Sequence, residues 1–343
     1  MGVITIIGAG MMGSAMAYPA RDNGNEVRLV GTHLDEDIIA QAAQTGMHLT
    51  LKRRLPEGIR YYQTGDTKEA LEGASLVIGG VSSFGVDWFK EQMLPLIPRT
   101  VPLLSITKGL VNTPEGGLVS YPAVYAGSPG GMGLSLNAVG GPCTSYELAD
   151  HDPTEVCFCG GDMAELRRIK AMLETEYYHI SLSTDVFGVE CAVALKNAYA
   201  LGVTLAVGLS EKKDGKMHYN SQAALFGQSI REMRRILSLY GGRDENIYLG
   251  AGDLYVTVFG GRTRLIGTLL GKGYSFDAAM AELKGVTLES IVIAKRTTAA
   301  ILARAERGKA DQADFPLLMH IDAILAGRQE VNIPWRAFAT EMA

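Results

Sequence analysis

The sequence predicts an α/β protein with two domains: an N-terminal doubly wound sheet, followed by an all-α C-terminal domain. A β-branched run at 3–7 leads into a glycine-rich turn and a helical stretch. Strand-like runs then alternate with helical stretches, and after residue 186 the chain is rich in Ala, Leu, Arg and Glu with helical spacing. We therefore expect a sheet domain over 1–185 and a helical domain over 186–343.

The size and charge of the chain limit its function classes. Its 343 residues are more than a single hydrophobic core usually includes, so two domains are expected. The net charge of −5 offers no basic surface for nucleic acid, and no nucleic-acid partner is predicted. No CxxC pair occurs, so we expect reduced packing cysteines and no metal site. The cysteines are Cys143, Cys157, Cys159 and Cys191.

One run, 188–209, is long and apolar enough to cross a membrane. It contains Glu190, Lys196 and Asn197, and charged segments flank it on both sides. No basic leader precedes the apolar run at the N-terminus. We therefore expect a buried helix in a cytoplasmic protein with no membrane partner.

The first strand, 3–7, ends in the turn GAGMMG, and a helical stretch to about residue 23 and a second strand at 26–31 follow. Within this unit a GxGxxG turn is typical of dinucleotide binding. The first glycine permits the tight turn, the second lets the backbone approach a pyrophosphate, and the third allows close helix packing. The alternative is a tight turn without a ligand. The predicted cofactor contacts here are Gly8, Gly10, Met11, Met12 and Gly13.

The end of the second strand commonly distinguishes NAD from NADP, because an acid there binds the ribose 2′-hydroxyl. Here Thr32 and His33 follow Gly31, and the first acids come later, at Asp35 and Glu36. We expect NAD or NADP as the cofactor, with a slight preference for NADP, and Thr32 and His33 as contacts. Further strands are expected at 74–81, 101–107, 136–141 and 154–160.

Five polar residues stand in positions that favour chemistry. They are Lys108, Lys196, Asn197, Asp253 and Arg262. Lys108 ends an apolar strand, where ligands of open α/β sheets bind; alternatively it is solvated there. Lys196 has apolar neighbours around its helix, but it could extend to water. Asn197 could bridge backbone groups, Asp253 could cap a helix, and Arg262 could lie on the surface.

These residue types suit the reduction of a carbonyl. Charge builds on the carbonyl oxygen as hydride arrives, so a positioned cation and a proton are needed. A lysine in an apolar wall supplies both, because desolvation favours its neutral form. A nearby aspartate can orient it, and an arginine in a Gly-Gly-Arg turn can hold a phosphate ester at two points.

Several segments together resemble the NAD(P)-dependent glycerol-3-phosphate dehydrogenase family over roughly 1–335. The resemblance implies a Rossmann domain, a helical substrate domain and a site in the cleft between them. It implies reversible reduction of dihydroxyacetone phosphate to sn-glycerol 3-phosphate, and commonly a homodimer. The matching segments are GAGMMG, SITKG (105–109), GGPCTSYELA (140–149), GVECAVALKNAYALGVTLAVGL (188–209), NSQAAL (220–225) and GAGDLYVTVFGGRTR (250–264).

The resemblance also implies roles for individual residues. Lys196 matches the proton donor, and Asp253 and Thr257 match its polar support. Lys108 and Asn197 match contacts to the substrate's oxygens, and Arg262 matches the phosphate anchor. Predicted cofactor contacts outside the glycine turn are Lys108, Gly141, Pro142, Arg262 and Lys284.

The chain departs from the family pattern at a few positions. Thr263 follows the phosphate arginine where Asn is usual, and we expect it to contact the substrate. Cys143 and Thr144 replace a usual serine and phenylalanine, and Lys284-Gly285 replaces a usual EG or QG. The substrate is therefore expected to be dihydroxyacetone phosphate or a closely related phosphorylated ketone.

Two other functions compete with this expectation. A 2-ketoacid reductase of the ketopantoate reductase or opine dehydrogenase type also pairs a Rossmann domain with a helical domain, but it binds carboxylates and does not require Arg262. A redox-sensing NAD(P)-binding protein would not need Lys196 inside an apolar helix.

Overall fold

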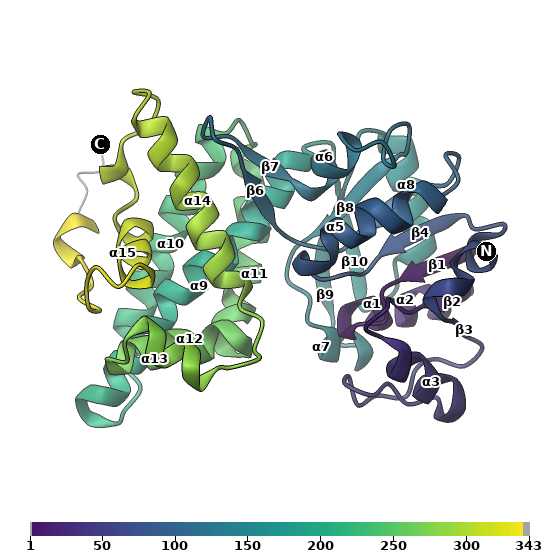
Figure 1. Ribbon diagram of the computed structural model, residues 1–343, viewed down its shortest axis with the longest axis horizontal. Helices are drawn as coiled ribbons and strands as arrows, with labels where there is room; N and C mark the ends of the chain where they lie inside the picture. The colour runs from purple at the N-terminus through teal and green to yellow at the C-terminus, as the bar shows by residue number, and fades with distance from the viewer. Residues whose placement is uncertain (1, 339–343) are drawn as a thin grey trace. The chain divides into compact units, whose positions relative to one another are not determined.

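The computed structural model describes residues 2–338, which form two compact units. The first unit runs to Lys108 and continues over Ser120–Glu190; the second takes Gly109–Val119 and the chain after Glu190. Figure 1 labels most helices and strands of both units. The expected boundary near 185 lies a few residues before the end of the first unit, and the segment taken from 109–119 was not anticipated.

The first unit is built on an eight-stranded sheet of order β10-β9-β8-β5-β4-β1-β2-β3. Neighbouring strands are parallel except that β9 runs antiparallel to β8. Strands β3 and β10 were not expected, because neither shows a continuous apolar run. The strands are β1 (Val3–Ile7), β2 (Glu26–Val30), β3 (Arg60–Tyr62), β4 (Leu76–Gly79), β5 (Leu103–Ser105), β8 (Leu136–Gly140), β9 (Thr154–Cys159) and β10 (Tyr178–Ser183).

Helices connect these strands and confirm the doubly wound fold. The single helix expected to about residue 23 is two short ones, because Pro19 has no amide hydrogen and its ring conflicts with the carbonyl of Ala15. The helices are α1 (Met11–Ala15), α2 (Ala17–Asp22), α3 (Glu36–Thr45), α4 (Thr67–Leu71), α5 (Val86–Trp88), α6 (Tyr121–Ala126), α7 (Ser145–Ala149) and α8 (Met163–Leu173), with short 3₁₀ or π turns at Thr64–Asp66, Ser83–Gly85, Phe89–Met93 and Leu94–Leu96.

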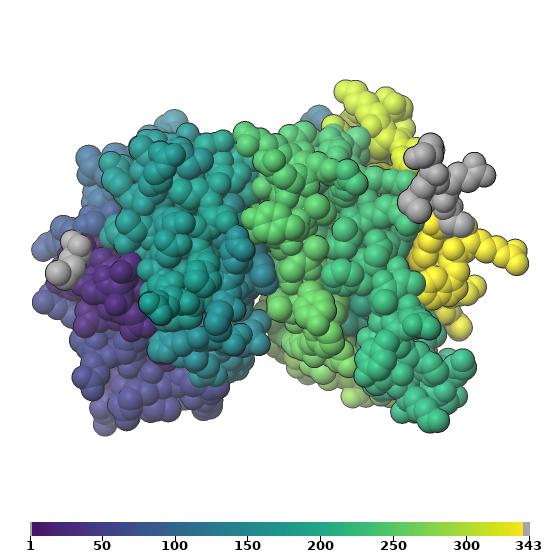
Figure 2. Space-filling model, turned by 180° about the vertical axis from the view of Figure 1, so that it is seen from behind, coloured from purple at the N-terminus to yellow at the C-terminus, as the bar shows by residue number. Residues whose placement is uncertain are grey.

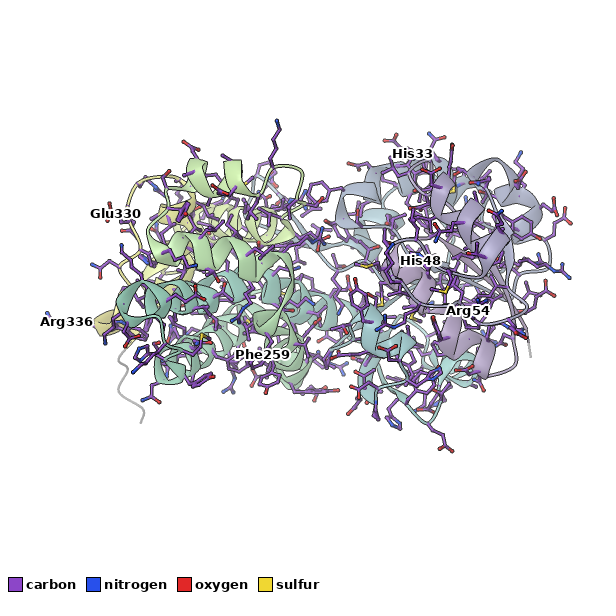
Figure 3. All side chains as sticks on the ribbon, turned by 90° about the horizontal axis from the view of Figure 1, so that it is seen from below. His33, His48, Arg54, Phe259, Glu330 and Arg336 are labelled. Atoms are coloured by element: carbon purple, nitrogen blue, oxygen red, sulfur yellow. The ribbon has the colours of Figure 1, made fainter. Side chains whose placement is uncertain are left out.

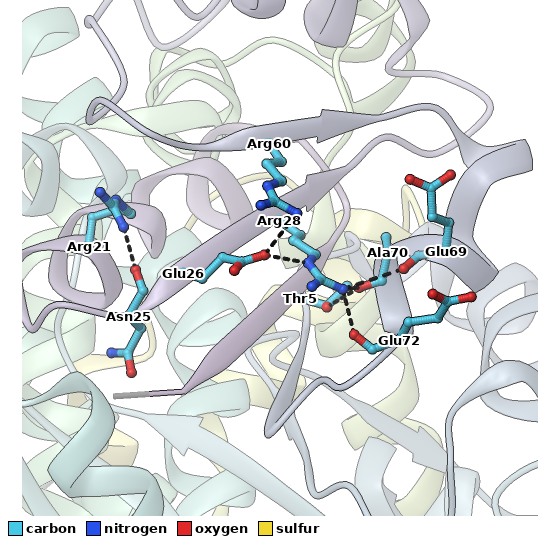
Figure 4. A network of polar contacts seen from close by, with 9 residues as sticks. All are labelled: Thr5, Arg21, Asn25, Glu26, Arg28, Arg60, Glu69, Ala70 and Glu72. Carbon is cyan, nitrogen blue, oxygen red and sulfur yellow. Dashed lines mark hydrogen bonds and ion pairs between the residues drawn. The ribbon is translucent and has the colours of Figure 1, made fainter.

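A polar network fixes α4 to the sheet (Figure 4). The guanidinium of Arg28 on β2 donates to the carbonyl oxygens of Ala70 (3.2 Å) and Glu72 (2.6 Å), at the end of α4. The hydroxyl of Thr5 on β1 donates to the Ala70 carbonyl at 2.6 Å. These donors satisfy carbonyl groups that a helix end leaves without partners, and Glu26 holds the guanidinium from the other side at 2.9 Å.

The second unit is helical and also receives a β-hairpin from the N-terminal half of the chain. Arg296 donates to the Leu110 carbonyl (2.9 Å), and Tyr240 donates to the Gly116 carbonyl (3.0 Å). The hairpin strands are β6 (Leu110–Asn112) and β7 (Leu118–Ser120). The helices are α9 (Val186–Asp214), α10 (Tyr219–Leu239), α11 (Ile247–Phe259), α12 (Gly261–Lys272), α13 (Phe276–Glu282), α14 (Glu289–Ala305) and α15 (Pro316–Leu325), with 3₁₀ turns at Asp244–Asn246, Gln312–Asp314 and Trp335–Phe338.

Helix α9 is the core of this unit. It alone among the described residues is long and apolar enough to cross a membrane, and 89% of its most apolar window is buried. It continues to Asp214, past the end of the apolar run at 209. A Cβ added to Gly267 on α12 would lie 1.9 Å from Oγ1 of Thr204 on α9, so only glycine permits this approach. Figure 2 shows the helical unit's outer side chains in green and yellow.

Candidate active site

The glycine turn has the geometry of a dinucleotide cradle. Gly8 has φ +112°, and a Cβ there would lie 2.7 Å from the Gly80 carbonyl. A Cβ on Gly13 would lie 2.0 Å from the Gly8 oxygen, so a side chain is excluded at both positions. A Cβ on Gly10 would meet no atom within 4 Å. The space beside Gly10 and the unpaired amides at the start of α1 fit a pyrophosphate.

Two side chains hold the Ala9 peptide of this turn from both sides. The carboxylate oxygen Oδ2 of Asp35 accepts from the Ala9 amide at 3.1 Å, and from the amide (2.9 Å) and hydroxyl (2.8 Å) of Thr32. On the other side, Nε2 of His48 lies 2.8 Å from the Ala9 carbonyl oxygen. Asp35 therefore supports the cofactor turn from within the protein, a role that its place beyond the strand end did not reveal.

His48 has a defined tautomer. Its Nδ1 lies 3.0 Å from the amide nitrogen of Leu51 and 3.3 Å from that of Thr50, and amides can only donate. Nδ1 is therefore the unprotonated acceptor, and Nε2–H donates to Ala9. The ring is fully buried, and this burial lowers the pKa of His48. This role of His48 was not predicted, because a lone histidine carries no motif.

The other predicted contacts near the turn differ in exposure. Thr32 is buried and hydrogen-bonded to Asp35. His33 is exposed, and the centroid of its ring lies 5.3 Å from that of Trp88. Figure 3 labels His33 and His48, which belong to this unit. Met11 is exposed and Met12 is half-buried. The methionine side chains thus differ, while their amides share the start of α1.

Lys108 and Gly141 meet at the ends of neighbouring strands. Strands β5 and β8 are adjacent and parallel, so the residues that follow them lie at the same edge. The ammonium of Lys108 donates to the Gly141 carbonyl oxygen at 2.7 Å. The next residue, Pro142, is half-buried, and its carbonyl accepts from the Thr154 hydroxyl. Lys108 therefore lies at the edge where open α/β sheets usually bind their ligands.

The helical unit contains a buried ion pair. The ammonium of Lys196 on α9 donates to the carboxylate of Asp253 on α11. The Lys196 side chain is 15% exposed and that of Asp253 is 1% exposed. Lys196 is therefore neither solvated nor free of a counter-ion, and Asp253 is not a helix cap, because it lies within α11.

Close packing of the two helices sets this pair. A Cβ on Gly250 of α11 would lie 2.5 Å from the carbonyl oxygen of Ala192 on α9. Lys196 follows Ala192 by one helical turn, and Asp253 follows Gly250 by almost one turn. The contact at Gly250 thus brings the helices near enough for the ammonium and carboxylate to meet.

The remaining candidates lie around these helices. Asn197 is buried beside Lys196 on α9. The hydroxyl of Thr257 donates to the backbone carbonyl of Asp253 at 2.7 Å, not to the carboxylate as the support role would suggest. Arg262 is exposed in the first turn of α12, and the neighbouring Thr263 is buried. Lys284 is exposed in the turn after α13.

A glycine turn on a parallel sheet and a buried lysine–aspartate pair in a helical unit define an NAD(P)-dependent oxidoreductase. The family described as NAD-dependent glycerol-3-phosphate dehydrogenase matches this chain with its N-terminal model over residues 3–165 and its C-terminal model over 185–335. The chain belongs to this family, and the resemblance inferred from its segments is confirmed.

Individual relatives agree. The chain is 33% identical over 290 residues to an NADP(+)-dependent glycerol-3-phosphate dehydrogenase of Archaeoglobus fulgidus, covering 82% of this chain and 84% of the relative. A crystal structure of glycerol-3-phosphate dehydrogenase from Coxiella burnetii matches with TM-score 0.79 and 25% identity, covering 98% and 97% of the two chains. A ketopantoate reductase from Ralstonia eutropha, at TM-score 0.54, 15% identity and coverage of 96% and 100%, shares the fold alone.

Proposed function

We propose that this enzyme catalyses the reversible NAD(P)H-dependent reduction of dihydroxyacetone phosphate to sn-glycerol 3-phosphate. The observation that carries the proposal is the buried Lys196–Asp253 pair on packed helices. A cation in this setting is costly to build, and its mostly buried ammonium supplies both a positive charge and a proton.

The chain's own residues divide the work. A bound reduced nicotinamide cofactor supplies the hydride. Lys196 stabilises the charge that develops on the carbonyl oxygen and then donates a proton to it, which completes the alcohol. Asp253 orients the ammonium and balances its charge. The Thr257 hydroxyl donates to the backbone carbonyl of Asp253.

Substrate binding is assigned to other polar residues of the chain. Asn197 and Lys108 contact the substrate's oxygens. Arg262, exposed at the start of α12, anchors the phosphate group together with Thr263 and the first amides of the helix. Arg262 and the exposed Lys284 are also proposed to contact the cofactor, as are Gly141 and Pro142 in the sheet unit.

A parallel assay tests the reaction. The purified protein is mixed with NADPH or NADH and with dihydroxyacetone phosphate or ketopantoate, and oxidation of the cofactor is followed by absorbance. We expect turnover with the phosphate ester, competitive inhibition by inorganic phosphate, and a higher kcat/KM with NADPH than with NADH. Turnover with ketopantoate alone would replace this proposal with a 2-ketoacid reductase.

We further propose that the enzyme acts in the cytoplasm as a homodimer. An exposed aromatic cluster on the helical unit supports self-association: Tyr255 is 57% exposed and Phe259 is 59% exposed. Their ring centroids lie 4.8 Å apart, and Phe226 contacts Tyr255 edge-on at 6.5 Å. Light scattering should give twice the chain mass, and Tyr255→Glu should reduce it to the mass of one chain.

A further inference from the structure

Glu190 is a buried acid without the bonds that usually accompany burial. It lies in the second turn of α9 and is fully buried, and neither carboxyl oxygen has a hydrogen-bond partner within residues 2–338. Such a group costs free energy unless another interaction offsets its desolvation. A function for the carboxyl would explain why the chain retains it.

Glu232 on α10 shows how this chain treats a structural buried acid. Its carboxylate accepts from Tyr199 (3.0 Å), from Gln228 (2.7 Å), and from the amides of Leu317 (2.8 Å) and Leu318 (3.0 Å) at the start of α15. Both glutamates are fully buried, yet only Glu232 is bonded in this way. Burial alone therefore does not account for the isolation of Glu190.

Three titratable groups on other elements interact with Glu190. They are Lys108 after β5, Tyr125 on α6 and Cys159 at the end of β9. Asp185, just before α9, interacts with Cys159. Burial raises the pKa of both Tyr125 and Cys159 far above neutrality, so these two groups carry no charge. The cation of this group is Lys108.

The protonation state of Glu190 changes within a useful range. Burial raises the pKa of this carboxyl to about 8, and the nearby Lys108 charge opposes the rise. At neutral pH the acid is therefore protonated, and the Lys108 ammonium donates to the Gly141 carbonyl. Above about pH 8 the carboxylate is an anion with no hydrogen-bond donor among the described residues, so it competes for the same ammonium.

We propose that Glu190 is a positioning residue for Lys108: its protonated carboxyl leaves the ammonium on the Gly141 carbonyl, and its ionised form draws the ammonium away. The inference rests on the proposed function, in which Lys108 contacts the substrate. Lys108 and Glu190 are each the last residue of a segment of the first unit, directly before the chain enters the second unit. Ionisation of Glu190 therefore sets the alkaline limit of activity.

The first test compares pH profiles of kcat/KM for dihydroxyacetone phosphate reduction. We expect the wild type to lose activity with a midpoint near pH 8. Glu190→Gln, which imitates the protonated acid, should shift or remove this midpoint while kcat/KM at neutral pH falls by less than about tenfold. The matched control Glu232→Gln should keep the wild-type midpoint. An unchanged midpoint in Glu190→Gln overturns the inference.

The second test needs no turnover. Infrared difference spectra between Glu190→Gln and the wild type should show the carbonyl stretch of a protonated acid at neutral pH, lost above about pH 8. In Lys108→Gln this loss should move to higher pH, because the charge that favours ionisation is gone. A carboxylate band at neutral pH, or no effect of Lys108→Gln, contradicts the inference. Failure of the proposed function would instead appear as wild-type protein that oxidises no cofactor with the phosphate ester.

Discussion

The two units build their candidate functional groups in different ways. The sheet unit uses backbone: Gly8, Gly10 and Gly13 create a cradle, and side chains only hold its peptide in place. The helical unit uses charged side chains, and a glycine contact merely brings them together. A backbone cradle suits the phosphates that all nicotinamide dinucleotides share, whereas we propose that the buried lysine takes part in one chemical step.

This difference predicts opposite kinds of sensitivity. The glycine turn should lose cofactor affinity when a Cβ is added, because binding there depends on a close approach of the backbone. The lysine–aspartate pair should lose activity when a charged group is removed, because its proposed role depends on that charge. Four sets of variants test this contrast and the residues around it.

The largest effect is expected from Lys196→Met. It removes the proposed proton donor and should lower kcat by about 10³-fold, within the usual range for general acid catalysis. Cofactor affinity, measured by titration of NADPH fluorescence, should stay near that of the wild type. Because a lone Asp253 charge would remain buried, the double variant Lys196→Met/Asp253→Asn serves as a second, charge-free test. Turnover near the wild-type rate in either protein would remove Lys196 from the proposed chemistry.

The next effect is expected from alanine in the glycine turn. Gly13→Ala forces a Cβ against the Gly8 oxygen, so it should lower both cofactor affinity, by about 100-fold, and the free energy of unfolding, by about 1–3 kcal/mol. Gly10→Ala has room for its Cβ, so its free energy of unfolding should change little while its cofactor affinity still falls. Calorimetric titration and denaturant unfolding measure the two quantities. Equal destabilisation by both variants would contradict the cradle.

Arg262→Ala should act on substrate binding. Loss of a charge-assisted anchor, worth about 1.5–3 kcal/mol, should raise KM for dihydroxyacetone phosphate by about 10–150-fold with a smaller change in kcat. Arg243→Ala removes an exposed arginine of the same unit that pairs with Glu245, and it should leave KM unchanged. Steady-state kinetics with both variants decide the matter, and a similar KM for the two would rule out the anchor.

The smallest effect concerns pH and His48. Burial lowers the pKa of His48, so the unfolded chain binds a proton at a pH where the folded ring stays neutral. Stability from this group is present above the ordinary histidine pKa of about 6.5 and falls with acidification, by at most about 1.4 kcal/mol per pH unit. His48→Asn should flatten this dependence in denaturant unfolding. The same slope in wild type and His48→Asn would show that burial does not hold the His48 ring neutral in the folded chain.

Much of the fold and of the site was predictable. The strand–turn–helix pattern fixed the position of the cofactor turn, and Lys196 was noticed because a charge within an apolar helix is costly. Asp35 and His48 were missed, since their contacts to Ala9 join distant segments with no shared motif. Glu190 was recognisable only as a charge in an apolar run. The assignment of the hairpin at 110–120 to the second unit was not predictable, because its sequence shows no feature that links it to the helices.

The sequence by itself determined the class of the protein, because periodicity, glycine spacing and rare charged residues are local properties that can be read from short stretches of the chain. Only the tertiary structure decided which charges are satisfied. It paired Lys196 with Asp253, gave Glu232 four donors, and left Glu190 with Lys108 as its neighbouring cation. Partnership and burial depend on close approach between segments far apart in the chain, and no local pattern encodes that distance.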